Sequence, residues 1–381
     1  MKDPRFAGLL IRALRLERNW SQETLCRGIC AVSYLSKIEQ GKVEANRDML
    51  TDLFDRLQIR WIESAELDRL RDEFYESIFS WNGGEVPGMR RILEEKWDSL
   101  RTSSKYADFL VIRAYLNHEP ELVPDELIPL LDSRQRALFA ISSKLHDKAY
   151  QVYPCPLTAF CVAVEAYLKG NYTLALEYFQ ISCDQAAREG YVYIQMYVQS
   201  YMSNCYADMG NLDAMRRHSR IAERLGKALG DREIVETVQY NLAATMVEFG
   251  DYEGGYTHFC SVESPGIMDL HKLAICCEAL GKPEEAMAAI ERAATLQPRN
   301  PMEVELCNIV RYRLEHPDYL HDETYGALLL NTFGKMREEL HFGYARFHLR
   351  WVCQWLTANR QYRKAYEILK SFPEYSTLNG I

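Results

Sequence analysis

The chain has 381 residues, of which 48% are hydrophobic and 26% are charged, a composition typical of globular proteins with two or three domains. No run of eighteen apolar residues occurs, so the sequence predicts no membrane span. The N-terminus lacks the apolar stretch of a secretion signal, and the eleven cysteines include no CxxC pair. We therefore expect a cytoplasmic protein whose thiols are reduced and mostly buried.

The net charge of −9 is unevenly distributed along the chain. Residues 1–60 hold eleven Lys and Arg against eight Asp and Glu, whereas the remainder holds 34 basic and 46 acidic residues. A local charge of +3 thus precedes a body of charge −12. Basic character confined to one end indicates that any contact with nucleic acid is made there.

The first two predicted helices lie within this basic segment. One spans residues 5–18 and turns Leu10 and Leu14 towards a core. The second is short: Ser21 is its expected N-cap, Leu25 points inward, and Gly28 follows its end.

A third helix is predicted over residues 32–41 (VSYLSKIEQG), where Gly41 supplies the left-handed stop. Leu35 and Ile38 share its inner face, while Ser33, Ser36, Lys37 and Gln40 share the outer face. Two short helices joined by a tight turn, the second with a polar outer face, form a helix-turn-helix motif. In that motif the second helix enters the DNA major groove.

Residues 20–25 (WSQETL) and 28–42 (GICAVSYLSKIEQGK) resemble the phage-repressor (Cro/C1, XRE-type) DNA-binding domain. More narrowly, they resemble its version in the peptide-responsive regulators of Gram-positive bacteria, the PlcR/Rgg group. The resemblance covers residues 6–60 and implies a homodimer that binds a palindromic operator under the control of a short signalling peptide. The residues expected to contact DNA are Gln22, Val32, Ser33, Tyr34, Ser36, Lys37 and Lys42.

Two residues of the third helix have sharper expectations. Val32 stands where an amide or Arg would read a base through two hydrogen bonds, so contact with a thymine methyl group is expected instead. Glu39 lies at the negative end of the helix dipole, which is unfavourable for a carboxylate. The resemblance implies that Arg15 offsets this by forming an ion pair with Glu39 that joins the first helix to the third.

The predicted architecture is all-α in three segments. Residues 1–60 form a five-helix helix-turn-helix domain, residues 61–84 a connecting helix, and residues 85–381 a right-handed α-solenoid for peptide binding and dimerisation. The solenoid resembles tetratricopeptide (TPR) repeats. Glycine-containing turns recur between apolar-periodic helices, and a degenerate copy occurs near the C-terminus; the turn residues are Gly170, Gly210, Gly250, Gly281 and Arg360.

Small residues support this phasing. A small side chain stands seven residues before each turn residue: Ala163, Ser203, Ala243, Ala274 and Cys353. The second helix of three copies carries an Ala, whereas Met215 and Gly255 replace it in the other two. The 40-residue spacing of the first turns exceeds the typical repeat of about 34 residues. Residues 85–150 are expected to be helical but cannot be phased.

In repeats of this kind the first helices line the concave surface, at positions 2, 6, 9 and 10 before the turn. Amides there suit the backbone of an extended peptide, and aromatic rings suit its apolar side chains. Polar packing where helices splay is the competing interpretation. The expected peptide-binding residues are Tyr167, Tyr197, Ser200, Tyr201, Asn204, Asp208, Thr237, Tyr240, Asn241, Glu248, His271, Lys272 and Gln354; counting from Arg360 also gives Arg350 and Trp351.

No nucleotide-binding, zinc-protease or serine-hydrolase motif occurs, so neither an enzyme nor a cofactor is expected. His341 and His348 lie seven residues apart on one helical face, yet a metal site would need further ligands. The favoured function is a peptide-controlled transcriptional regulator. The alternative is a TPR interaction scaffold, or an inhibitor of phosphatases or kinases, in which DNA binding is not the main activity.

Overall fold

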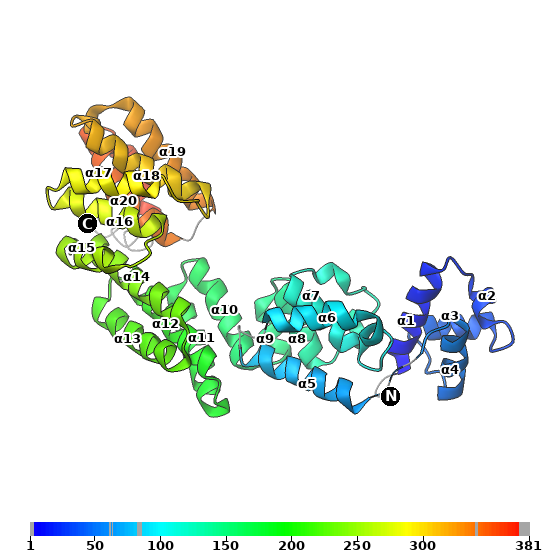
Figure 1. Cartoon of the computed structure of the whole chain (residues 1–381). Helices are drawn as coiled ribbons and strands as arrows, with labels where there is room; N and C mark the ends of the chain where they lie inside the picture. The colour runs from blue at the N-terminus through cyan, green and yellow to red at the C-terminus, as the bar shows by residue number, and fades with distance from the viewer. Residues whose placement is uncertain (1–3, 61, 63, 82–85, 340–341, 373–381) are drawn as a thin grey trace. The chain divides into compact units, whose positions relative to one another are not determined.

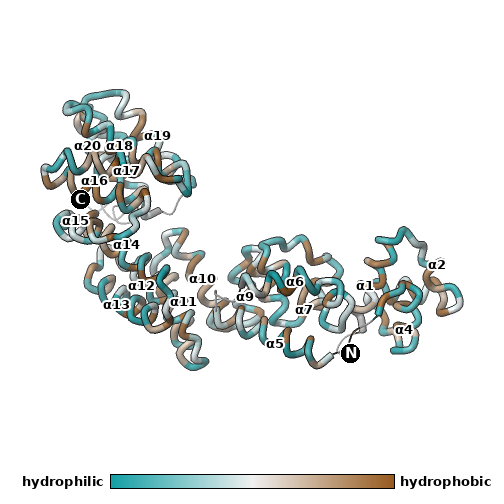
Figure 2. Tube along the Cα trace, in the orientation of Figure 1, coloured by the Kyte–Doolittle hydropathy of each residue, from teal (hydrophilic) through white to brown (hydrophobic). Residues whose placement is uncertain are grey.

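The computed structural model describes residues 4–60, 62, 64–81, 86–339 and 342–372 (Figure 1). These residues are all-α: they contain no strand, only an isolated parallel bridge between Ile62 and Ser103. The chain divides into two compact units. Unit 1 comprises Met1–Ala163 with Tyr178–Gln195, and unit 2 comprises Val164–Glu177 with Met196–Ile381. Figure 2 shows apolar and polar positions alternating along the helices, as amphipathic packing requires.

Unit 1 begins with four short helices, α1 (Pro4–Glu17), α2 (Gln22–Cys26), α3 (Val32–Glu39) and α4 (Arg47–Arg56). The sequence predicted five helices in this segment. Among residues 4–60 the structure has four: α4 is followed by its C-cap Leu57, and Gln58 adopts a left-handed φ of 54°. Ser21 caps α2 by accepting from the Thr24 amide at 3.0 Å, as expected.

These helices enclose one apolar core formed by all four of them, including Leu14, Leu25, Leu35 and Leu53. Gly8 allows α1 to approach α3 closely, because a Cβ atom at this position would lie 2.0 Å from the Ile38 carbonyl oxygen. The close crossing fixes α3 against α1.

The rest of unit 1 is mainly helical in its described residues, as expected for residues 85–150. The predicted connecting helix is α5, and it packs on α7, since Phe74 meets Phe109 edge-on at 6.2 Å and the Tyr75 hydroxyl donates to Asp108 at 2.8 Å. The elements are α5 (Ala65–Phe79), α6 (Val86–Arg101), α7 (Tyr106–Asn117), η2 (Pro120–Leu122), η3 (Ile128–Leu130), α8 (Ser133–Ser142) and α9 (His146–Val152).

Helices α10 (Pro156–Leu168), α11 (Tyr172–Glu189) and α12 (Val192–Asp208) contribute residues to both units. Unit 2 continues with α13 (Leu212–Leu229), α14 (Arg232–Glu248), α15 (Tyr252–Ser261), α16 (Ile267–Ala279), α17 (Pro283–Ala293), α18 (Pro301–Glu315), η4 (Tyr319–His321), α19 (Glu323–Glu339), α20 (Phe342–Ala358) and α21 (Tyr362–Lys370). From α13 to α21, each helix packs on its neighbours in sequence.

The five turns predicted from sequence share one geometry. Each turn residue has a left-handed φ: 74° at Gly170, 72° at Gly210, 91° at Gly250, 70° at Gly281 and 60° at Arg360. In each turn its amide bonds the carbonyl three residues back, and the next amide bonds the carbonyl five residues back. This is a Schellman-type helix end. The degenerate copy at Arg360 therefore keeps the turn despite lacking glycine.

The small residues of the first helices are buried at four of the five positions: Ala163, Ser203, Ala243 and Ala274. Packing also explains why Gly255 replaces the Ala that other repeats carry in the second helix. A Cβ atom there would lie 2.3 Å from Val247 Cγ2 and 2.9 Å from the Cys276 thiol. Glycine is the residue that lets α15 approach both α14 and α16.

Candidate functional site

The outer face of α3 is exposed as the sequence predicted. Leu35 and Ile38 are fully buried, whereas Val32, Ser33 and Lys37 are exposed. Among the other residues expected to contact DNA, Lys42 is exposed, whereas Gln22, Tyr34 and Ser36 are half-buried. The structure thus presents an eight-residue helix whose outward side chains are free of the core.

A buried ion pair holds α3 in place. Arg15 donates from Nε and Nη2 to the two carboxylate oxygens of Glu39, at 2.7 and 2.8 Å. Gln22 adds an amide donor to Glu39 Oε2 at 2.8 Å, and Arg15 Nη1 donates to the Trp20 carbonyl at 2.7 Å. The Glu39 hydrogen bond is the largest cause of a raised Arg15 pKa. The predicted Arg15–Glu39 pair is confirmed, and Gln22, expected at DNA, also belongs to this network.

The two asparagines predicted on neighbouring first helices lie next to each other. Asn241 Nδ2 donates to Asn204 Oδ1 at 3.3 Å, and both side chains are half-buried. One turn before Asn204 on α12, Tyr201 meets Tyr167 of α10 edge-on, with ring centroids 5.6 Å apart. The remaining members of this part of the predicted set are Tyr197, Ser200, Thr237 and Tyr240, of which Ser200 is buried and Thr237 exposed.

Four other predicted positions meet one helix, α20. We call Asp208, Glu248, His271 and Lys272 the α20-facing surface. Arg346 reaches the first two, with Nη2 at 3.2 Å from Asp208 Oδ1 and 2.9 Å from Glu248 Oε2. The histidine ring stacks on His348 at 5.8 Å, and Lys272 Nζ lies 3.0 Å from the Phe347 ring centroid. Gln354, also predicted, is exposed.

Sequence reasoning did not identify Arg346, Phe347 or His348 as part of this surface. Arg346 is separated from its two carboxylates by 138 and 98 residues, a distance that helical periodicity does not bridge. The sequence relates His348 only to His341, which lies outside the described residues. Within the part of the chain that is described, no group of three or more His, Cys, Asp or Glu is arranged for a metal ion.

Burial perturbs the titration of this surface. The pKa of Asp208 rises to about 6 through desolvation, against the lowering effect of Arg346. The pKa of Lys272 falls to about 7 and that of His348 to about 3, in both cases chiefly through desolvation. Perturbed pKa values of this kind cluster at functional sites, although structural networks also produce them.

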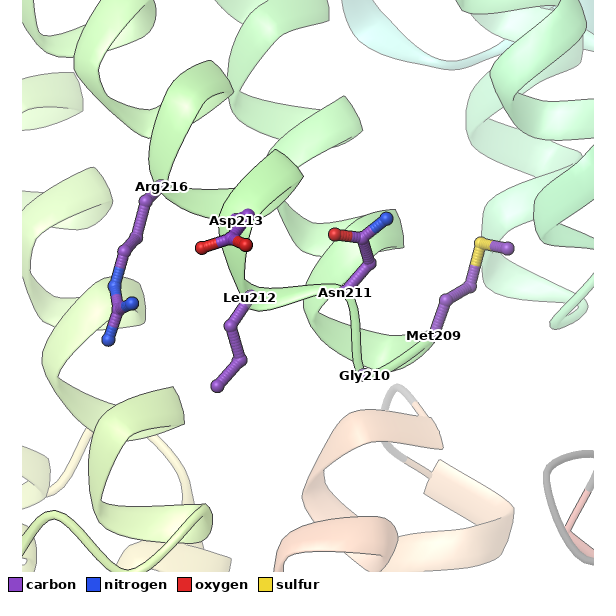
Figure 3. A pocket seen from close by; sticks show the side chains of 6 residues that line it. All are labelled: Met209, Gly210, Asn211, Leu212, Asp213 and Arg216. Atoms are coloured by element: carbon purple, nitrogen blue, oxygen red, sulfur yellow. The ribbon is translucent and has the colours of Figure 1, made fainter.

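A separate open pocket of about 590 Å³ lies on the turn between α12 and α13. It is lined by Met209, Gly210, Asn211, Leu212, Asp213 and Arg216. Figure 3 shows the labelled side chains spread along the turn rather than converging on one point. None of the predicted peptide-binding residues lines it.

Comparison with known proteins agrees with the N-terminal geometry. Residues 11–63 match the helix-turn-helix family. The chain is 23% identical over 259 residues to the transcriptional activator NprA of Geobacillus stearothermophilus, a match that covers 58% of this chain and 62% of that protein. The chain thus spans about three fifths of the length of this relative. In the described residues, no helix is long and apolar enough to cross a membrane.

Among solved structures, the chain is similar to PlcR of Bacillus thuringiensis in complex with the peptide PapR7 and DNA. The match is 17% identical, covers 81% of this chain and 98% of that chain, and has a TM-score of 0.26. The sequence match and the geometry of α1–α4 show that the N-terminal segment of the chain is a helix-turn-helix domain.

Proposed function

We propose that this helix-turn-helix protein is a sequence-specific DNA-binding transcriptional regulator controlled by a short signalling peptide. Residues 1–60 contact DNA, and residues 85–381 bind the peptide and a second copy of the chain. Residues 61–84 connect these two domains. The protein acts in the cytoplasm, as a homodimer on a palindromic operator. Regulation rather than catalysis is its activity.

The observation that carries DNA binding is the fixed, exposed outer face of α3. Val32, Ser33 and Lys37 project from a helix whose inner face is fully buried and whose end is held by the Arg15–Glu39 pair. A rigid short helix with small and basic outward residues is what the major groove admits. The local charge of +3 supports phosphate contact, and the match to a transcriptional activator supports the same function.

Peptide control is supported by the predicted first-helix positions of unit 2. The Asn204–Asn241 pair offers amide groups, and the edge-on pair of Tyr167 and Tyr201 offers aromatic surface. Asparagine is a poor helix former, so two of them on adjacent helices favour a binding role over packing alone. Amide groups can bond the backbone of a peptide whatever its sequence.

The test begins with the full chain and a random duplex library. Selection of bound duplexes, followed by fluorescence anisotropy of the enriched site against salt, is expected to yield a palindromic sequence bound far more tightly than random DNA. The binding constant should fall with salt, as phosphate contacts require. Failure to enrich any sequence, together with equal binding of random DNA, would instead favour the scaffold function. Sedimentation of the protein with and without the duplex reports the proposed dimer.

A further inference from the structure

Lys272 is a buried cation that has no carboxylate partner among the described residues. It is 4% exposed, and its Nζ lies over the Phe347 ring. Within the described residues no carboxylate lies within 4.0 Å of it, and Glu248 acts on it only from farther away. An ammonium removed from water without an ion pair destabilises the fold. Met or Leu at this position would stabilise the core more than a lysine does, so packing alone does not account for Lys272.

Two histidines beside Lys272 have ring nitrogens that lack a hydrogen-bond partner among the residues that the structure describes. These atoms are His271 Nδ1 and His348 Nε2, on side chains that are 1% and 2% exposed. His348 Nδ1 donates to the Tyr344 carbonyl at 2.9 Å. The neutral ring therefore presents Nε2 as an acceptor, and the protonated ring would present it as a donor. Buried polar atoms usually have partners, so two orphaned ring nitrogens beside an unpaired cation point to an absent group.

The surrounding charges do not compensate Lys272. Arg350 donates to the Tyr252 hydroxyl at 2.5 Å and stacks on Trp351 at 4.1 Å, without a carboxylate partner in the described chain. The carboxylates of three acidic residues in this region are held by other cations. Arg313 pairs with Glu278 at 2.5 Å, and Arg346 pairs with Asp208 and Glu248. Among the described residues, neither Lys272 nor Arg350 therefore has a carboxylate within 4.0 Å.

We propose that Lys272, flanked by His271, His348 and Arg350, is a subsite for a carboxylate of the ligand. The inference rests on the proposed peptide control and specifies one chemical group that the peptide carries. Two sources supply this group: the C-terminal carboxylate of the peptide, or an Asp or Glu side chain. The carboxylate accepts hydrogen bonds from Lys272 Nζ and, once a proton is taken up from solvent, from His348 Nε2.

Entry of the carboxylate requires the Phe347 ring to leave Lys272. Phe347 is adjacent to Arg346, which ties α20 to Asp208 and Glu248. A ligand that replaces the cation–π contact with a charge-assisted hydrogen bond gains more than it displaces. The subsite is therefore closed in this structure and opens by movement of Phe347 within α20.

The experiment uses the full chain and an equimolar library of random heptapeptides with free C-termini. Bound peptides are identified by mass spectrometry, and the most enriched sequences are synthesised in three forms: unmodified, C-terminally amidated, and with each Asp or Glu replaced by Asn or Gln. Calorimetry then gives the affinity of each form for the wild type, Lys272→Met, and Lys364→Met, which removes an exposed lysine of α21.

We expect one of the two neutralised forms to bind the wild type about tenfold more weakly, the loss of one charge-assisted hydrogen bond. Which form loses affinity identifies the source of the carboxylate. Lys272→Met should bind all forms with the same weakened affinity, and Lys364→Met should behave as the wild type. Equal affinity of the wild type for all three forms overturns the subsite and leaves peptide control standing. Failure of the wild type to enrich any peptide overturns the proposed function and the subsite together.

Discussion

Arg15 and Glu39 form a two-pronged ion pair that joins α1 to the C-terminal end of α3, with side chains 9% and 2% exposed. The pair offsets the unfavourable position of a carboxylate at the negative end of the helix dipole. Both side chains are buried, so neither charge would be solvated if the pair separated in place. The pair therefore fixes the position of α3 against α1.

Replacing Arg15 by Ala is therefore expected to destabilise α3 by about 3–5 kcal/mol, since it leaves the Glu39 carboxylate buried with Gln22 as its remaining side-chain partner. Hydrogen exchange of the α3 amides in the full chain measures the loss. Arg12→Ala is the matched control, because Arg12 pairs with Glu126 in an exposed position and should cost about 0–1 kcal/mol. Unchanged protection of α3 in Arg15→Ala, with lost DNA binding, would show that the pair does not hold the helix.

Lys37→Ala is expected to weaken binding of the selected operator by about 1–3 kcal/mol if the lysine reads a base. The side chain is exposed on the outer face of α3, so its removal should leave the fold intact. Anisotropy titrations against operator and random DNA separate the two roles. An equal loss on both duplexes would assign Lys37 to phosphate, and no loss on either would remove it from the interface. Lys364→Ala removes the same charge far along the sequence and serves as the control.

Val32 provides a second test of base reading. It is 42% exposed at the start of α3, and an apolar side chain there fits a thymine methyl group. Replacing each operator thymine in turn by deoxyuridine removes only that methyl. At one position, the loss of the methyl group should weaken binding of the wild type but leave binding of Val32→Ala unchanged. If the effects of the deoxyuridine and of Val32→Ala were additive at every position, Val32 would not contact a thymine methyl group.

Local chemistry made the helix-turn-helix predictable. The Ser21 cap, the left-handed Gly28 and Gly41, and the apolar pair Leu35 and Ile38 lie within a few residues of one another, so short-range rules apply. The five turns of the repeats were predictable for the same reason. Residues 85–150 could not be phased, yet Lys144 makes the same type of turn with a φ of 58° and no glycine to signal it.

The approach of α20 could not be predicted from sequence. First-helix counting placed Asp208, Glu248 and Lys272 on one surface, but nothing in the periodicity indicated what would contact them. Arg346 and Phe347 reach them from α20, far along the chain, through packing that depends on every intervening turn. Charge placement at long range is therefore the part of the candidate site that only the folded structure supplies.

The Asn204–Asn241 pair predicts a loss of peptide affinity. Replacing either residue by Ala should weaken binding of an enriched heptapeptide about tenfold, or about 1.4 kcal/mol, through one unmade backbone hydrogen bond. Calorimetry measures the change, and Gln180→Ala, an exposed amide of α11, is the control. Tight binding by both variants, equal to that of the wild type, would place the peptide elsewhere.

Lys272 also predicts how stability depends on pH. Burial lowers its folded-state pKa to about 7, against an unfolded value near 10.4. Between these two values the unfolded chain binds a proton on Lys272 that the folded chain does not, so the free energy of unfolding rises with pH across this window. The charged neighbours Glu248 and Arg350 oppose one another in setting the size of the effect.

The ligand-free wild type should therefore unfold at a higher urea concentration at pH 9 than at pH 7, and Lys272→Met should lose most of this difference. Met is also expected to stabilise the protein at pH 7, because it removes the cost of burying a charge without an ion pair. Equilibrium unfolding followed by circular dichroism at the two pH values measures both effects, with Lys364→Met as the control. A pH dependence that Lys272→Met leaves unchanged would show that the lysine is solvated in the folded protein. Stabilisation at pH 7 combined with weaker binding of a carboxylate-bearing peptide would show that the chain keeps this cation for its ligand rather than for its fold.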